Sequence, residues 1–238
     1  MNDYIIYNGT NSHDVADLVI TELPEMVIPE ERVTFTDVPG LSGSLTQTQG
    51  TDVYHDRTLA VECYLRQPTA DNIDKVTAYF RGAGKLYLPN RPDGYYEARV
   101  INQISFRKIL RGRSPRSFTV NFRCKPLFRL YSGETEQTIE TSGASITNPS
   151  TVQAKPKITI AGSGDVTLMV GGTQIVELTD VENGIVLDSE IQEAYWGETL
   201  QNSRMSGPFP ALKPGANAIS WSGGTVTSVK ITPRWVTL

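Results

Sequence analysis

The chain has 238 residues, of which 39% are hydrophobic and 20% charged, a balance typical of a folded globular protein. No apolar run approaches the roughly 18 residues that span a membrane, and residues 1–20 carry acids but no Lys or Arg, so we expect neither a membrane span nor a secretory leader. The net charge of −4 is uneven, because residues 1–130 hold 16 Lys and Arg against 15 Asp and Glu, whereas residues 131–238 hold 6 against 11. Two domains of unlike character are therefore expected.

Two alternating segments predict strands on which both cysteines are buried. Thr58–Arg66 reads TLAVECYLR and places Cys63 on its apolar side, and Phe118–Cys124 does the same for Cys124. Alternation of this kind is typical of a strand with one face in the core. Both cysteines are therefore predicted to be buried, reduced thiols that behave as small hydrophobic residues.

Between these two segments the spacing of the apolar residues changes from that of a strand to that of a helix. Ile73, Val76 and Phe80 fall on one stripe of a helix, and Thr69 or Asp71 supplies an N-cap before it. Glycine follows at position 82, where a helix commonly ends. The pattern predicts one helix of about three turns, and we expect no other helix in the chain.

Charges of opposite sign gather in two separate stretches. Residues 1–31 hold seven acids and no Lys or Arg, whereas residues 98–133 hold nine Lys and Arg and no acid. The basic stretch suits either the phosphates of a nucleic acid or pairing with the acidic stretch, within a subunit or across a subunit boundary. We favour the pairing, because complementary patches on one chain suit a ring in which unlike faces meet. The candidate interface residues are Arg107, Lys108, Arg111, Arg113, Arg116, Glu22, Glu25, Glu30 and Glu31.

A polar stretch, residues 132–153, shows almost no apolar periodicity. We expect the domain boundary and a linker here, with an N-terminal domain at 1–133 and a C-terminal domain at 134–238.

Short strand-like runs with frequent turn signals follow the polar stretch. Gly171-Gly172 and Asn183-Gly184 each predict a hairpin turn. The proline-rich stretch Gly207–Gly224 is predicted to connect strands and not to form a catalytic loop, because proline withholds the N–H that a central strand needs. Short strands separated by frequent turns predict a C-terminal β-sandwich.

Motifs for catalysis, metals and cofactors are absent from the sequence. The chain has only two histidines, His13 and His55, and no HExxH, CxxC, nucleophile elbow or Walker loop. We therefore expect no catalytic residue, no bound metal and no cofactor. Tyr195 and Trp196 leave open an alternative function, a carbohydrate-binding module in which these rings stack on a sugar of the host cell wall.

The order of several segments resembles the distal tail proteins of siphophages, hub components that join the tail tube to the baseplate in phages of Gram-positive hosts. VPGLSGSL at Val38–Leu45 is followed by Tyr54, by Arg57 and by the first alternating strand, and the helix leads into GKLYLP. The C-terminal part contains VLDSEIQEAYW and the ending FPALKPGANAISWSGGTVTSVKITPRW. The likeness covers nearly the whole chain.

The resemblance implies a mainly β, non-enzymatic virion protein, present in the host cytoplasm during assembly. Its N-terminal β-rich domain with one α-helix would form a homohexameric ring around a channel for DNA and the tape-measure protein, without specific recognition of DNA. Its C-terminal domain would be a galectin-like or carbohydrate-module-like β-sandwich. The implied partners are the major tail tube protein on one face of the ring and a tail-associated tip or lysin protein on the other, with no membrane contact.

Overall fold

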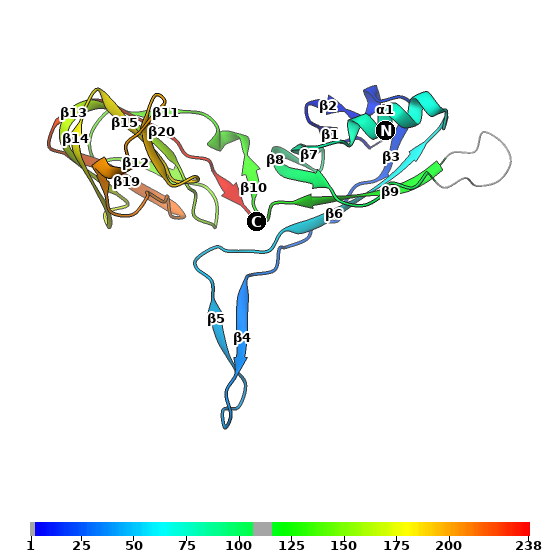
Figure 1. Cartoon of the computed structure of the whole chain (residues 1–238), viewed down its shortest axis with the longest axis horizontal. Helices are drawn as coiled ribbons and strands as arrows, with labels where there is room; N and C mark the ends of the chain where they lie inside the picture. Colours follow the sequence, from blue (N-terminus) through cyan, green and yellow to red (C-terminus); the bar gives the residue numbers. More distant parts are fainter. Residues whose placement is uncertain (1–2, 107–115) are drawn as a thin grey trace. The chain divides into compact units, whose positions relative to one another are not determined.

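The structure, a computed structural model, describes residues 3–106 and 116–238, with only the backbone of Arg116. It is mainly β with one α-helix among the described residues, which confirms the predicted fold class (Figure 1). The chain forms two compact units, residues 1–128 with Leu238 and residues 129–237. The domain boundary after residue 133 stays a prediction.

Unit 1 is built on one antiparallel sheet with strand order β2-β1-β7-β8-β9-β6-β3. The long pair β6–β9 runs in register from Arg57 opposite Cys124 to Leu65 opposite Arg116. Side chains alternate along β6, so that Leu59 and Val61 are buried while Thr58 and Ala60 are exposed. The predicted first alternating strand is confirmed. The strands are β1 (Ile6–Tyr7), β2 (Thr10–Asn11), β3 (Leu18–Glu22), β6 (Arg57–Leu65), β7 (Ala83–Leu88), β8 (Arg91–Val100) and β9 (Arg116–Cys124), with a 3-10 turn η1 at Ser12–Asp14. Strand β10 (Phe128–Leu130) begins at the last residue of this stretch and continues into unit 2.

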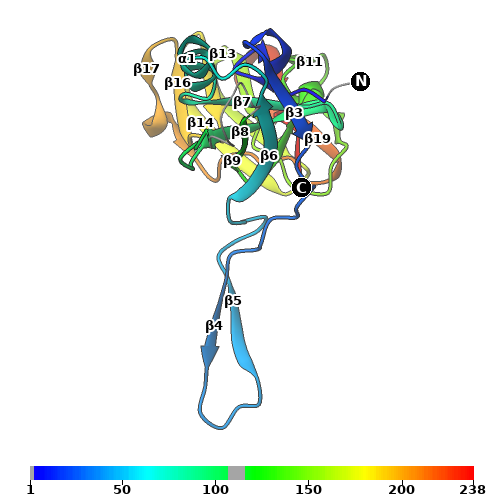
Figure 2. The ribbon, with the colours of Figure 1, turned by 90° about the vertical axis from the view of Figure 1, so that its right-hand side faces the viewer.

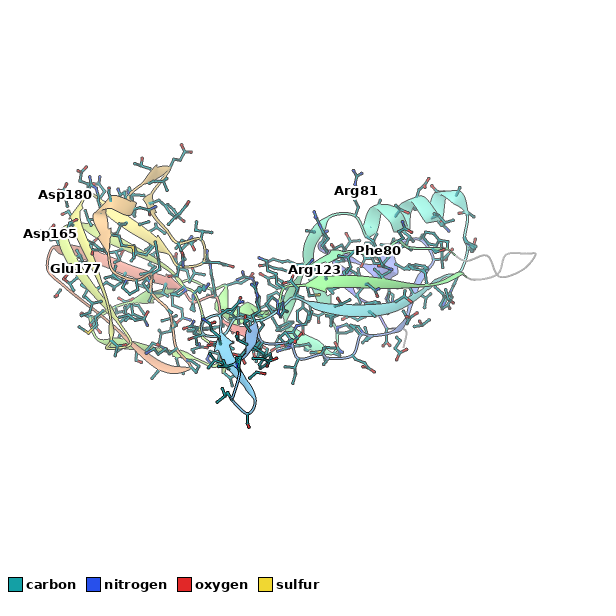
Figure 3. The ribbon with its side chains drawn as sticks, turned by 60° about the horizontal axis from the view of Figure 1, so that its bottom comes forward. Phe80, Arg81, Arg123, Asp165, Glu177 and Asp180 are labelled. Atoms are coloured by element: carbon teal, nitrogen blue, oxygen red, sulfur yellow. The ribbon has the colours of Figure 1, made fainter. Side chains whose placement is uncertain are left out.

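Helix α1 (Ala70–Tyr79) packs on this sheet, as the apolar stripe predicts. Thr69 is the N-cap, and its hydroxyl accepts a hydrogen bond from the backbone N–H of Asn72 at 3.2 Å. Phe80 turns toward the sheet and Arg81 away from it (Figure 3). The ring centroid of Phe80 lies 6.0 Å from that of Phe122 on β9. The predicted helix is confirmed.

Both cysteines lie on the buried face of β6 and β9, as predicted. Cys63 is opposite Phe118 and Cys124 is opposite Arg57, so the two thiols sit at far ends of the same ladder and form no disulfide. Burial raises the pKa of each thiol to about 12.

We predict that neither thiol reacts with a thiol reagent at pH 8 while the protein is folded, because the reactive thiolate is suppressed and covered. The check is the absorbance released from Ellman's reagent with and without denaturant. Two thiols per chain are expected in denaturant and none without it. Rapid release from the native protein would contradict the burial.

Unit 2 is a β-sandwich whose longest strand, β13, belongs to both sheets. Residues 157–163 of β13 pair with β15 and β20, and residues 164–170 pair with β14 and β19. The ladder shifts register at two glycines of this strand, Gly162 and Gly164. Gly162 is required because a Cβ there would lie 2.2 Å from the carbonyl oxygen of Thr225. A bulge of this kind lets one strand bend out of one sheet and into the other.

The core of unit 2 lies between the two halves of the sandwich. Ile158 and Ile160 from the first half of β13 meet Leu168 and Val170 from its second half, all fully buried, together with Trp235. The strands are β11 (Gln137–Ile139), β12 (Ala144–Asn148), β13 (Lys157–Val170), β14 (Gln174–Val181), β15 (Gly184–Asp188), β16 (Glu193–Trp196), β17 (Thr199–Leu200), β18 (Met205–Ser206), β19 (Gly215–Ser222), β20 (Thr225–Thr232) and β21 (Val236–Thr237), with 3-10 turns η2 (Tyr131–Gly133) and η3 (Asn202–Arg204).

The structure corrects three local predictions in unit 2. Residues 132–153 are not a linker, because they contain β11 and β12. Asn183-Gly184 turns the chain but does not close a hairpin, since β14 and β15 pair with different halves of β13. Gly171-Gly172 does lie in a hairpin, but Val170 pairs with Gln174 and the loop therefore has three residues. The stretch Gly207–Gly224 leads into β19 and connects strands, as predicted.

Candidate assembly interface

A hairpin of β4 (Val33–Asp37) and β5 (Ser44–Thr48), which we call the arm, is exposed along nearly its whole length. The two strands form a sheet of their own and project away from the rest of unit 1 (Figures 1 and 2). A two-stranded hairpin without a third strand or a packed face is only marginally stable in water. The arm therefore has the structure of an element that another surface completes.

The tip of the arm is ordered by local hydrogen bonds. The Ser44 hydroxyl donates to Asp37 Oδ1 at 2.6 Å, across the last rung of the ladder. Within the tip, the Leu41 N–H donates to the Val38 carbonyl at 3.1 Å. Val38 and Leu41, the apolar residues of the tip, are 42% and 56% exposed.

Arg57 at the start of β6 fixes the root of the arm. Arg57 is 4% exposed, and its guanidinium lies 5.2 Å from the ring centroid of Tyr96 and donates to the carbonyls of Val27, at 2.7 Å, and of Pro126. Backbone bonds between residues 30–32 and 53–55 continue the connection toward the arm. The resemblance singled out Arg57 only as a motif position, and the structure gives that position an anchoring role.

Four exposed apolar side chains lie on the arm: Phe35 at 66%, Leu45 at 57%, and the two tip residues. Phe35 is opposite Thr46 and Leu45 is opposite Thr36 in the ladder, so these two side chains lie on opposite faces of the arm. The strands also carry no lysine or arginine, the side chains that commonly protect a free strand edge from pairing. Exposure and missing edge protection make the arm a candidate interaction surface, which sequence reasoning did not find.

The predicted acidic interface residues lie on the segment that leads from β3 to the arm. Glu22 ends β3, and Glu25, Glu30 and Glu31 follow on the way to β4; all four are exposed. Within the described part of the chain, none of the four carboxylates is in an ion pair. Their charges are therefore available to a partner.

The predicted basic residues are only partly covered by the structure. Arg107, Lys108, Arg111 and Arg113 lie outside the described residues, and the backbone of Arg116 begins β9. Two other basic residues of the stretch pair within unit 1: Arg123 contacts Asp56 at 2.7 Å and Lys125 contacts Glu97 at 2.5 Å (Arg123 in Figure 3). The acidic-to-basic interface stays a prediction.

No family model and no curated protein sequence matches the chain, so the comparison with known proteins uses the three-dimensional structure. Among solved structures, the chain superimposes on the SPP1 Dit (gp 19.1) protein, described as a paradigm of the hub adsorption apparatus in phages that infect Gram-positive bacteria. The TM-score is 0.75 at 13% identity, and 96% of each chain is covered. The chain has the Dit fold. The likeness to distal tail proteins predicted from the sequence is thus confirmed for the fold.

A second comparison is with a chain of the phage P2 baseplate in its activated conformation with Ca. It covers 97% of this chain and 98% of that one, at 10% identity and a TM-score of 0.44. That TM-score is too low to establish a shared fold.

In this Dit fold, the two candidate sugar-stacking residues do not form one platform. Tyr195 and Trp196 are neighbours in β16, so their side chains point to opposite faces of the sheet. The Trp196 ring packs against Gly184, where an added Cβ would lie 2.5 Å from Trp196 Cζ3. Tyr195 lies between Val186 and Leu200 on the neighbouring strands. Trp196 therefore has a packing role, and a flat two-ring stacking surface is not present.

A buried ion pair in unit 2 is the other charged feature that sequence reasoning missed. Asp188, at the end of β15, is 4% exposed and accepts two bonds from Arg234, at 2.6 and 2.8 Å. Arg234 also lies 3.4 Å from Glu190, which contacts Arg129. Burial alone would raise the pKa of Asp188, but the hydrogen bonds and charge of Arg234, with two backbone N–H groups, outweigh burial and lower that pKa. The network ties both ends of unit 2 to β15.

Three further acidic side chains lie on neighbouring strands of unit 2. Asp165, Glu177 and Asp180 lie on β13 and β14 (Figure 3), and Asp165 accepts a bond from the Asp180 N–H at 2.8 Å, beside the register shift between these strands. No group of three or more metal-ligating side chains occurs among the residues described. Nor, in that part of the chain, is any helix long and apolar enough to cross a membrane.

Proposed function

We propose that this protein is a structural, non-enzymatic component of a phage tail that assembles as a homohexameric ring between the tail tube and the baseplate or tail tip. The Dit fold supports the place in the tail, because the similar SPP1 protein is described as part of a hub adsorption apparatus. The exposed arm is the observation that supports self-assembly. It is held at its root and tip, exposes four apolar side chains, and has no partner surface of its own.

The proposed mechanism is geometric. Each copy contacts one neighbour with its arm and receives the arm of the other neighbour, and such unlike contacts generate a ring when the rotation closes. One face of the ring would meet the major tail tube protein, and the other a tail-associated tip or lysin protein. The tape-measure protein and DNA would pass through the channel without specific recognition. The protein would thus reside in the virion tail after assembly in the host cytoplasm.

Light scattering with negative-stain imaging, over a range of concentrations and salt, tests this function. We expect particles of six or twelve copies with a central hole. A monomer of 26.2 kDa at every concentration would contradict self-assembly.

The carbohydrate alternative is tested separately by titrating host wall polysaccharide into the protein, and we expect no binding heat, because Tyr195 and Trp196 face opposite ways.

The acidic and basic stretches give a second, independent prediction. Reversing the charge at Arg111, Arg113 and Arg116 is expected to weaken assembly, because these cations are proposed to meet the free carboxylates near the arm in a neighbouring copy. The check is the concentration at which rings form, measured in low and high salt. The matched control is Lys213→Glu, an exposed cation of unit 2. Intact rings at unchanged concentration in the triple variant would remove these residues from the interface.

A further inference from the structure

Arg57 is a buried cation without a counter-charge. It is 4% exposed, and among the described residues it takes part in no ion pair. Its partners are the carbonyls of Val27 and Pro126 and the face of the Tyr96 ring. Its Nε–H is buried and donates to no acceptor in the described part of the chain. The pKa of Arg57 is lowered, mainly by burial, so the guanidinium occupies a position that is unfavourable for a charge.

An apolar side chain of similar size would be tolerated at this position. Replacing buried charged groups with well-packed apolar residues of similar volume is often neutral or stabilising. The two carbonyls that Arg57 binds belong to residues that reach the surface, since Val27 is 45% exposed and Pro126 is half-buried. Water can therefore replace the guanidinium as their donor. The stability of unit 1 does not require an arginine here.

The hydrogen bonds of Arg57 join three segments that are far apart in the sequence. Val27 lies in the connection from β3 to the arm, Arg57 begins β6 directly after the return connection, and Pro126 follows β9. Residues 23–29 run without a helix, turn or bend. For these seven residues, the bond from Arg57 to the Val27 carbonyl is the only hydrogen bond within the described part of the chain. Arg57 thus ties the segment that enters the arm to the sheet of unit 1.

The other bonds near the root hold the arm together without attaching it to the sheet. Backbone bonds join residues 30–32 to residues 49–55, so the arm and its two connections form one piece. A bond from Arg123 on β9 to Asp56 does reach this piece, but both side chains are exposed, and exposed pairs contribute little. The buried link between the arm and the sheet is therefore Arg57.

We infer that Arg57 is a positioning residue, which holds the arm in one direction relative to the sheet of unit 1 before assembly and is retained for that role and not for stability. This inference rests on the proposed ring and deepens it, because it names the residue that prepares the arm for contact. Fixing a binding element in its bound direction reduces the entropy that is lost on association. An arm that points correctly for about one tenth of the time would raise the apparent dissociation constant about tenfold.

Pulsed electron spin resonance between two labels on one chain tests the inference. The labels are attached at Leu41→Cys, in the exposed tip, and at Thr77→Cys, on the exposed side of α1. The native cysteines are buried and stay unlabelled in the folded protein. The distance distribution is measured at a concentration where light scattering shows a monomer. It is compared between the doubly labelled protein, its Arg57→Met variant and the control Arg66→Met, which replaces an exposed arginine directly after β6.

We expect a narrow distance distribution for the doubly labelled protein and for Arg66→Met, and a broad one for Arg57→Met. The melting temperature of Arg57→Met, measured by calorimetry, is expected to be no lower than that of the protein with Arg57. Without the labels, the concentration at which Arg57→Met forms rings is expected to rise about tenfold. A change in the direction of the arm without a loss of stability is the result that a merely structural arginine would not give.

Each contrary result overturns a separate part of the account. A narrow distribution in Arg57→Met would overturn the positioning role. A broad distribution with a lower melting temperature would show that Arg57 is retained for stability. Rings at unchanged concentration in Arg57→Met would show that the direction of the arm does not limit assembly. A wild-type protein that has a narrow distribution but stays monomeric at every concentration would overturn the proposed ring and leave the positioning role confirmed.

Discussion

Replacing the arm with a two-residue turn converts the protein into a folded monomer. Residues 33–48 are removed and Asn-Gly is placed between Arg32 and Gln49. The Gln49 N–H donates to the Arg32 carbonyl at 3.3 Å, so the two ends are already adjacent, and Asn-Gly favours a tight hairpin turn. Loss of assembly is expected at every concentration, because each fully buried Phe or Leu contributes about 1.5–3 kcal/mol to a contact and several are lost together.

Folding of this deletion variant is expected to be unchanged. The arm forms its own sheet and places none of its side chains in a buried core, so neither unit loses packing. Circular dichroism and the melting temperature provide the control for folding, and light scattering provides the readout. Rings of unchanged mass from the deletion variant would show that assembly depends on another surface.

Arg234→Ala is predicted to lower the free energy of unfolding of unit 2 by much more than a substitution at a surface ion pair does. The substitution removes the two hydrogen bonds that Arg234 donates to the buried Asp188 carboxylate, which keeps the bond from the Glu190 N–H at 3.1 Å. Removing one partner of a fully buried pair costs about 3–5 kcal/mol, and because the Arg234 side chain is 23% exposed we expect a loss near the lower end, about 3 kcal/mol. Urea unfolding followed by tryptophan fluorescence measures the change, because Trp196, Trp221 and Trp235 all lie in unit 2. The matched control is Lys230→Ala, which breaks an exposed pair with Glu136 and is expected to cost less than about 1 kcal/mol.

The pH dependence gives this prediction a second readout. The pKa of Asp188 is lower in the folded protein than its ordinary value. The stabilisation from this group is therefore fully present above the ordinary aspartate pKa and is lost as the pH falls through the lowered one. Wild-type unit 2 should lose stability in acid by more than Arg234→Ala does. Parallel curves for the two proteins would show that the pair does not set the acid stability.

The elements that the sequence predicted are those with a strong period. Strand β6 alternates over nine residues, and α1 combines an apolar stripe with the Thr69 cap. By contrast, β11 and β12 are short and each buries one isoleucine, so no period is visible and residues 132–153 look like a linker. Such strands are identified by their partners in the sheet and not by their own sequences.

The missed features depend on contacts between distant residues. Asp188 and Arg234 are 46 residues apart, and nothing in either local sequence indicates that they pair. The arm lies within the stretch that showed the family resemblance, yet its polar, threonine-rich strands resemble an ordinary surface loop. Its importance becomes visible only because the fold leaves β4 and β5 outside both larger sheets.

Cryo-electron microscopy of the purified, assembled protein tests the central claim most directly. We expect a closed ring with six-fold symmetry, a central channel, and each arm in contact with a neighbouring copy. An open filament, a two-fold dimer, or a ring whose arms extend freely into solvent would contradict it.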